Sequence, residues 1–148
     1  MRVRVTRLPH AAELPLPNYA SAGAAGADIC AALDTELVLR PGARAAVPTG
    51  LCVEIPEGYE LQVRPRSGLA LRDGVGLLNA PGTIDSDYRG EIKIIMVNHG
   101  TGDVRLRRGD RIAQLILAPV SHATFEETEA LTPSERGEAG FGSTGLRG

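Results

Sequence analysis

Short apolar runs recur along the chain, and each is bounded by Pro, Gly or acidic turn residues. At the N-terminus, Val3 and Val5 alternate with arginines, as on a strand with one buried face. We expect further strands at residues 27–33, 36–39, 43–47, 51–55 and 59–64. Many short strands separated by turns every eight to twelve residues or so are typical of an all-β sandwich or barrel.

Two longer stretches, 91–98 and 111–120, contain near-continuous apolar runs, which predicts strands covered on both faces. One short helix is expected over 67–72, with Ser67 as its N-cap. From about residue 132 the chain is rich in Gly, Ser and Glu, which indicates a mobile C-terminal tail over about 132–148. The sequence thus predicts a single domain over 1–148.

The composition narrows the classes of protein. With 148 residues, 43% hydrophobic but only 3% aromatic, the core must be built from Val, Ile, Leu and Ala. A net charge of −2 argues against coating of nucleic acid. No apolar stretch predicts a signal peptide or a membrane span, so we expect a cytoplasmic protein without a membrane partner. Cys30 and Cys52 lack metal-ligand spacing and are expected to be buried thiols.

Two segments carry residues suited to chemistry. In the first, Arg66 and Ser67 precede the expected helix, whose free N–H groups could seat a phosphate; a capped helix with solvated arginines explains these residues equally well. In the second, residues 79–90, a Pro-Gly followed by Thr-Ile predicts a hairpin. Asp85 and Asp87 would then point to opposite faces of a strand, so only one would face a pocket. An exposed acidic turn beside a packing tyrosine is the simpler reading of that segment alone.

Two weaker signals lie further along the chain. Gln114 interrupts an apolar run and must find a hydrogen-bond partner, which could be backbone. Phe141 is a lone aromatic in the glycine-rich tail and makes sense if it stacks on a planar ligand. Composition alone favours a disordered linker for this segment.

Taken together, these segments resemble the trimeric dUTPase family. The resemblance extends from residue 22 to residue 145 and includes five motifs in order. The motifs are AGADI at 25–29, PRSGLA at 65–70, GTIDSDYRGE at 82–91, GDRIAQL at 109–115 and RGEAGFGSTG at 136–145. The last motif departs from the usual pattern at Glu138 and Ala139, which could alter how the tail closes.

The resemblance implies an all-β, jelly-roll-like β-barrel assembled as a homotrimer with shared active sites. It implies Mg²⁺-assisted hydrolysis of dUTP to dUMP and pyrophosphate by water attack at the α-phosphate. Such an activity limits uracil incorporation into DNA and supplies dUMP for thymidylate synthesis.

The resemblance also implies roles for individual residues. Asp85 would orient and deprotonate the attacking water, and Tyr88 would pack under the deoxyribose and exclude a 2′-hydroxyl. The uracil edge would be read by the backbone from Asn79 to Ile84, which includes Gly82 and Thr83. The triphosphate cradle would be formed by Arg66, Ser67, Gln114, Arg136, Ser143 and Thr144, and Gly68 and Gly142 would also bind substrate. Phe141 would stack on uracil, and Asp28 would reach the Mg²⁺ through water.

Three rival interpretations differ in class. A dCTP deaminase has related motifs, although the run at 85–88 and the FGSTG tail favour a dUTPase. A non-enzymatic binding module is disfavoured because Asp85 is present. A structural β-protein explains neither the Phe141 tail nor the arginines around Pro65. The roles of Arg64, Arg89 and Arg111 stay open, since each could be an ion-pair partner.

Overall fold

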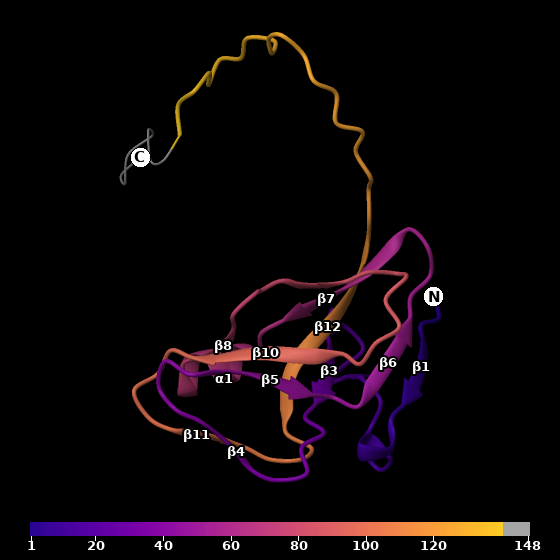
Figure 1. Ribbon diagram of the computed structural model, residues 1–148, viewed down its shortest axis with the longest axis vertical. Helices are drawn as coiled ribbons and strands as arrows, with labels where there is room; N and C mark the ends of the chain where they lie inside the picture. The colour runs from indigo at the N-terminus through magenta and orange to yellow at the C-terminus, as the bar shows by residue number, and fades with distance from the viewer. Residues whose placement is uncertain (141–148) are drawn as a thin grey trace.

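The structure is a computed structural model that describes residues 1–140 (Figure 1). It consists of twelve short strands, one α-helix and one 3₁₀ helix. In chain order these are β1 (Arg4–Arg7), η1 (Pro9–Ala11), β2 (Asn18–Tyr19), β3 (Ala27–Cys30), β4 (Leu37–Leu39), β5 (Arg44–Pro48), β6 (Leu51–Glu54), β7 (Tyr59–Arg64), α1 (Ser67–Asp73), β8 (Val75–Leu77), β9 (Gly82–Ile84), β10 (Lys93–Asn98), β11 (Val104–Leu106) and β12 (Arg111–Pro119).

The strands form four antiparallel sheets. The largest has the order β2-β3-β12-β7-β9, and a second has the order β5-β10-β8. Two-stranded pairs, β1-β6 and β11-β4, complete the body. After β12 the chain leaves this body as an extended segment (Figure 1), and residues 121–139 are exposed throughout.

Most of the expected elements are present, and the mostly β class with one short helix is confirmed. The expected strand at 59–64 coincides with β7, and the helix at 67–72 corresponds to α1. The short strands β2, β8 and β11 and the helix η1 were not predicted. No sheet closes on itself within residues 1–140, so the closed jelly-roll-like barrel is not confirmed.

The prediction that residues 91–98 are covered on both faces is wrong for this chain alone. In β10 the side chains of Ile94 and Met96 are buried, whereas Lys93 and Ile95 are exposed. Successive side chains of a strand point to opposite faces, so β10 has one face in the core and the other face open at Lys93 and Ile95, although Val97, further along that second face, is buried.

The core is aliphatic, as the composition requires. Its largest fully buried side chains include Ile29, Leu39, Ile94, Met96 and Ile112. The cysteines are free thiols: Cys30 is buried, and burial raises its pKa, whereas Cys52 is only half-buried. No helix of the described residues is long and apolar enough to cross a membrane.

Asn98 is a fully buried polar residue at the end of β10. Its amide Nδ2 donates to the carbonyls of Leu39 and Gly102, both at 2.8 Å, and its Oδ1 accepts from the Gly100 N–H at 2.8 Å. One side chain therefore satisfies three backbone groups and ties β10 to the segment around β4 and to the turn before β11.

We predict that Asn98→Asp strongly destabilises the fold. The substitution replaces the amide donor with a carboxylate oxygen that faces two carbonyls, so the free energy of unfolding should fall by at least about 2 kcal/mol. Urea denaturation at pH 7 and one fixed protein concentration measures the change. The exposed Asn79→Asp is the matched control and should stay within about 0.5 kcal/mol of the parent. Equal midpoints for the two variants would contradict the assigned network.

Candidate active site

A row of polar residues crosses the centre of the five-stranded sheet. In the register of β12, Gln114 lies opposite Asp28 of β3 on one side and opposite Arg64 of β7 on the other. Directly opposed residues of antiparallel strands share a face of the sheet. Three residues that are far apart in the sequence therefore meet in one row, and the amide of Gln114 donates to the carbonyl of Pro65 at 3.0 Å.

Helix α1 begins next to this row. The expectation that Ser67 caps the helix is wrong: Arg66 occupies the N-cap position with an extended backbone, and Ser67 is the first helical residue. No side-chain hydrogen bond caps this end. The N–H groups of the first turn lack intrahelical partners, because the carbonyls four residues before them lie outside the helix.

The row and the helix start line a cavity of about 440 Å³, here called the α1 pocket. The predicted residues that line it are Asp28, Arg66, Ser67, Gly68 and Gln114. Arg64 and Arg111 also line it, so three arginines face one carboxylate and the pocket is net positive. A positive cavity beside free backbone donors favours an anion.

Asp28 binds two of these arginines. Its Oδ1 lies 2.9 Å from Arg66 Nε, and its Oδ2 accepts from Arg111 Nη1 at 3.0 Å. Arg66 also donates to the Arg111 carbonyl at 3.1 Å. The Asp28 side chain is only 16% exposed, so these contacts orient both guanidinium groups at the pocket wall.

A second cavity, of about 550 Å³, lies beside β9 and is called the β9 pocket. The predicted residues that line it are Asn79, Gly82, Thr83, Ile84, Asp85 and Tyr88. Glu91 and Lys93 line it too, so its acidic groups outnumber its basic ones. Asp85 also borders a larger cavity of about 1040 Å³, whereas Asp87 lines only that larger one.

Two local expectations about this segment are wrong. Residues 79–84 do not form a paired hairpin, because β8 pairs with β10 whereas β9 pairs with β7. Strand β9 ends at Ile84, and a turn closed by the Tyr88 N–H on the Asp85 carbonyl (3.2 Å) follows. The turn, rather than alternation along a strand, separates the side chains of Asp85 and Asp87.

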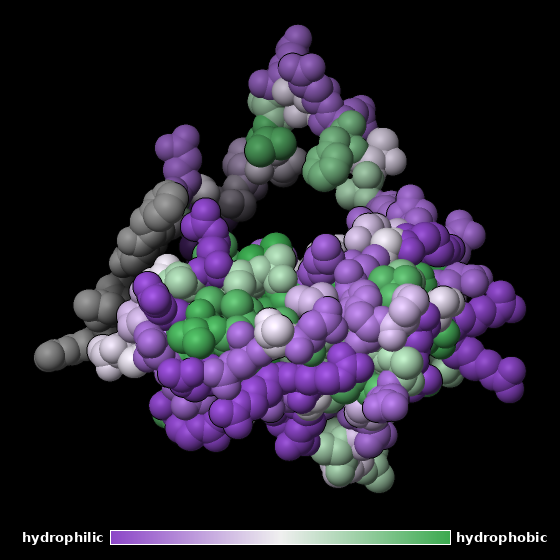
Figure 2. All heavy atoms as spheres, turned by 60° about the horizontal axis from the view of Figure 1, so that its bottom comes forward, coloured by the Kyte–Doolittle hydropathy of each residue, from purple (hydrophilic) through white to green (hydrophobic). Residues whose placement is uncertain are grey.

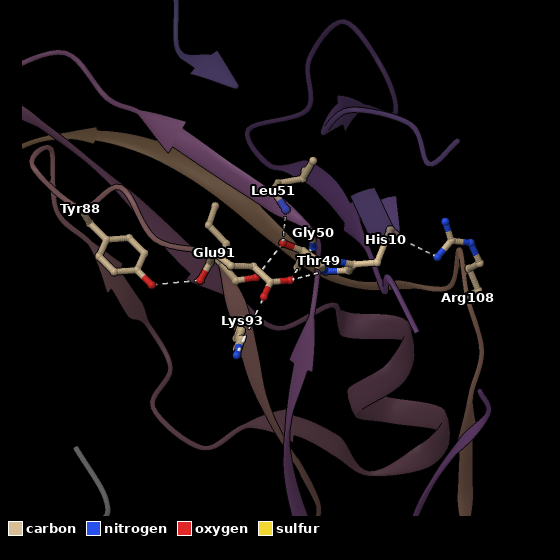
Figure 3. A network of polar contacts seen from close by, with 9 residues as sticks. His10, Thr49, Gly50, Leu51, Tyr88, Glu91, Lys93 and Arg108 are labelled. Carbon is tan, nitrogen blue, oxygen red and sulfur yellow. Dashed lines mark hydrogen bonds and ion pairs between the residues drawn. The ribbon is translucent and has the colours of Figure 1, made fainter. Parts of the chain in front are cut away.

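Figure 3 shows a polar network around Glu91, which lines the β9 pocket. The Glu91 carboxylate accepts hydrogen bonds at Oε1 from His10 Nε2 and from the Gly50 N–H, both at 2.8 Å. The Glu91 carbonyl accepts from the Tyr88 hydroxyl at 3.0 Å. Burial raises the pKa of Glu91, but the hydrogen bonds from His10 and Gly50 outweigh burial and leave that pKa below its usual value.

The structure thus divides the predicted residues between two pockets and leaves others outside both. Arg136 lies on the exposed C-terminal segment, where its Nε donates to the Ala139 carbonyl at 2.8 Å. Phe141, Gly142, Ser143 and Thr144 lie outside the described residues.

Sequence reasoning missed the contact between His10 and Glu91, because residues 81 positions apart give no local pattern. The structure also gives contacts for the three arginines whose roles the sequence leaves undecided. Arg111 pairs with Asp28, and Arg64 Nε donates to Gln62 at 3.1 Å. Arg89 donates to backbone carbonyls.

A family model described as dUTPase matches residues 12–145 of the chain. The chain belongs to the dUTPase family. It is 60% identical over 146 residues to a deoxyuridine 5′-triphosphate nucleotidohydrolase of Beijerinckia indica subsp. indica, which covers 97% of this chain and 91% of the relative. It is 52% identical over 145 residues to a protein of the same name from Anaplasma marginale, with 98% and 99% covered.

A solved structure of this family has the same architecture. The Staphylococcus bacteriophage 80alpha dUTPase with dUPNHPP superposes with a TM-score of 0.86 at 28% identity, and the match covers 98% of this chain and 99% of that chain. The membership that the five motifs predicted is confirmed, and with it the assignment to a family of nucleotidohydrolases.

We predict that Glu91→Gln lowers stability at neutral pH and that this difference disappears in acid. Because the folded-state pKa of Glu91 is lowered, its contribution is present above the unfolded value of about 4.3 and is lost as the pH falls through the folded value. Loss of the charge should cost about 1 kcal/mol at pH 7. Urea denaturation of both proteins from pH 7 to about pH 3 measures the difference. A pH-independent difference would contradict the lowered pKa.

Proposed function

We propose that the protein hydrolyses dUTP to dUMP and pyrophosphate, with water attacking the α-phosphorus. The observation that supports this best is the way the predicted residues sort into two pockets. The groups expected to read the nucleoside line the β9 pocket together with Asp85, and those expected to hold phosphates line the net-positive α1 pocket. In the cell this activity limits uracil incorporation into DNA and supplies dUMP for thymidylate synthesis.

The β9 pocket is suited to deoxyuridine. Backbone groups between Asn79 and Ile84 read the uracil edge, and Gly82, which is buried, leaves no side chain between that backbone and the base. Tyr88 forms the wall under the sugar, where a ribose 2′-hydroxyl would meet its ring. Asn79 and Thr83 border the same cavity. Rejection of the thymine methyl follows from the same close approach.

Asp85 acts as the general base. Its position at the exposed end of β9 places a carboxylate at the edge of the pocket, within reach of solvent. There it orients a water toward the α-phosphorus and takes the water's proton as the P–O bond forms and pyrophosphate leaves. It also holds the sugar 3′-hydroxyl, so one side chain aligns nucleoside and nucleophile.

The phosphates bind in the α1 pocket. Arg66, Ser67, Gly68 and Gln114 form the cradle, and Arg136, Phe141, Gly142, Ser143 and Thr144 of the tail close over the substrate, with Phe141 on the uracil. Arginine suits this role because its planar guanidinium binds phosphate oxygens in pairs. Closure of the tail would exclude bulk water from the reaction.

Mg²⁺ is the proposed cofactor, held mainly by the phosphate oxygens. This ion keeps several waters and uses few protein ligands. Asp28 lines the α1 pocket, where the phosphates are expected to bind, so it would reach a hydrated ion there through water. When bound, the ion would neutralise charge on the phosphates.

The active form is a homotrimer with shared sites. The α1 and β9 pockets share no lining residue, and Arg64 lines one while its neighbour Val63 lines the other from the opposite face of β7. Apolar side chains also gather on one face of the body (Figure 2). Leu71, Leu78 and Ile95 are exposed in the single chain, and a neighbouring subunit would cover such groups.

We predict that dUTP with Mg²⁺ releases pyrophosphate rapidly, whereas dCTP, dTTP and UTP do not. The base contacts and the Tyr88 wall account for this selectivity, and EDTA should abolish release because charge neutralisation is lost. A coupled pyrophosphate assay on the full chain measures all four nucleotides. Release of ammonia from dCTP would reassign the chain to the deaminases. If a folded protein released no pyrophosphate from any nucleotide, the chain would be a binding module instead.

We predict that Asp85→Asn retains dUTP binding but loses about 10²- to 10⁴-fold in kcat, because only the general base is removed. Steady-state kinetics and calorimetric titration with a non-hydrolysable dUTP analogue separate the two effects. Asp87→Asn is the matched control, since Asp87 does not line the β9 pocket, and it should keep near-parental kcat. Near-parental turnover in Asp85→Asn would refute the base assignment.

A further inference from the structure

His10 is not explained by the five motifs, and it lies before the region 12–145 that the family model matches. It nevertheless reaches the back of the nucleoside site. Its Nε2 contacts the Glu91 carboxylate (Figure 3) at a distance of 2.8 Å. The His10 side chain is 31% exposed. A residue near the N-terminus thus contacts the last residue of the third motif.

The surroundings of His10 hold it in this position. Helix η1 places His10 above the turn between β5 and β6, where the Leu8 N–H donates to the Gly50 carbonyl at 2.8 Å. Arg108 Nη1 donates to the His10 carbonyl at 2.6 Å. Gly50 allows this approach, because a Cβ there would overlap Ala11 and lie 3.2 Å from His10 Nε2.

Glu91 transmits this position to Tyr88. The Glu91 carbonyl accepts a hydrogen bond from the Tyr88 hydroxyl at 3.0 Å. Both backbone groups of the next residue, Ile92, are also hydrogen-bonded. The Ile92 N–H donates to Leu51 at 2.8 Å, and the Ile92 carbonyl accepts from the buried Thr49 hydroxyl at 2.6 Å. The backbone at 91–92 is therefore attached to the β5–β6 turn, the same turn on which η1 rests.

The Tyr88 ring itself has little packing to hold it, since it is 46% exposed. It folds back over Gly90, where an added Cβ would lie 2.6 Å from Tyr88 Cζ. The position of this ring depends on its hydroxyl contact and on close approach to the backbone of 90–91. Lys93 Nζ is 3.9 Å from Glu91 Oε2 and 57% exposed, so it adds little to this arrangement.

We propose that His10, through Glu91, is a positioning residue for Tyr88 and so sets the selectivity for deoxyribose over ribose. This inference rests on the proposed function, in which Tyr88 is the wall under the sugar. The Tyr88 ring can exclude a ribose 2′-hydroxyl only if the ring keeps its position. His10 keeps the carboxylate of Glu91, and with it the backbone carbonyl that receives the Tyr88 hydroxyl, in one place.

The test compares His10→Asn with His10→Gln. The amide Nδ2 of Asn cannot reach the place of His10 Nε2, whereas the longer Gln can put its Nε2 there. Pyrophosphate release gives kcat/KM for dUTP and for UTP, and their ratio is the measured quantity. His10→Asn should lower the ratio about 5-fold, which corresponds to one hydrogen bond. The change should come from a higher kcat/KM for UTP and a higher KM for dUTP, with kcat for dUTP retained.

Two further variants bracket the result. Gly90→Ala displaces the Tyr88 ring directly and should lower the ratio at least as much as His10→Asn. His99→Leu, at an exposed position away from the network, should keep the parental ratio. A purely structural role for His10 would change both substrates equally and leave the ratio unchanged.

The outcomes are distinguishable. A loss of selectivity in His10→Asn, with retention in His10→Gln and His99→Leu, supports the proposal. A parental ratio in His10→Asn together with a lowered ratio in Gly90→Ala overturns it, because Tyr88 would then be placed without His10. A parental protein that does not hydrolyse dUTP refutes the proposed function instead, before any variant is compared.

Discussion

The pairing of β12 with β3 on one side and β7 on the other is the contact on which both pockets depend. It brings Asp28, Gln114 and Arg64 into one row, and it places β7 so that Val63 can pair with Gly82 of β9 on its other side. The side-chain period of a strand is two, so a slip of one residue would turn the polar row into the core. The apolar neighbours of that row, among them Leu115, are buried and enforce the register. Burial of one face of the sheet thus determines the chemistry of the other.

Charge separates the two pockets in a way that suits a ligand with a neutral end and a polyanionic end. Three arginines line the α1 pocket, whereas Asp85 and Glu91 outnumber Lys93 in the β9 pocket. Arginines held close together repel one another, and Asp28, which binds Arg66 and Arg111 at once, offsets this repulsion. The same contacts orient the guanidinium groups before any ligand arrives, so less reorganisation is needed on binding.

What could be predicted from the sequence follows from the range of the interactions concerned. Strand β7 and helix α1 were predicted because alternation, prolines and glycines act over a few residues. Strands of two or three residues, such as β2 and β11, carry too little pattern to be found. The motifs named many residues of the two pockets, though not Arg64 or Asn79. The division of these residues between two cavities follows from the pairing of β8 with β10 and of β9 with β7. The contact of His10 with Glu91 spans most of the chain and has no local signal.

The scarcity of aromatic residues has a consequence for how such a site is held. An aliphatic core packs the sheets well, but it offers few large side chains to support the loops that leave them. In this chain those loops are held by polar side chains that bind backbone. Asn98 binds the carbonyls of Leu39 and Gly102, Thr49 binds the Ile92 carbonyl, and the Glu91 carboxylate binds the Gly50 N–H. Hydrogen bonds are directional, whereas apolar packing is not, so they define the position of a half-exposed ring more sharply than a few additional contacts would. In the proposed site, selectivity for deoxyribose would then depend on the polar groups that hold the Tyr88 ring, and this is how His10, near the N-terminus, would influence it.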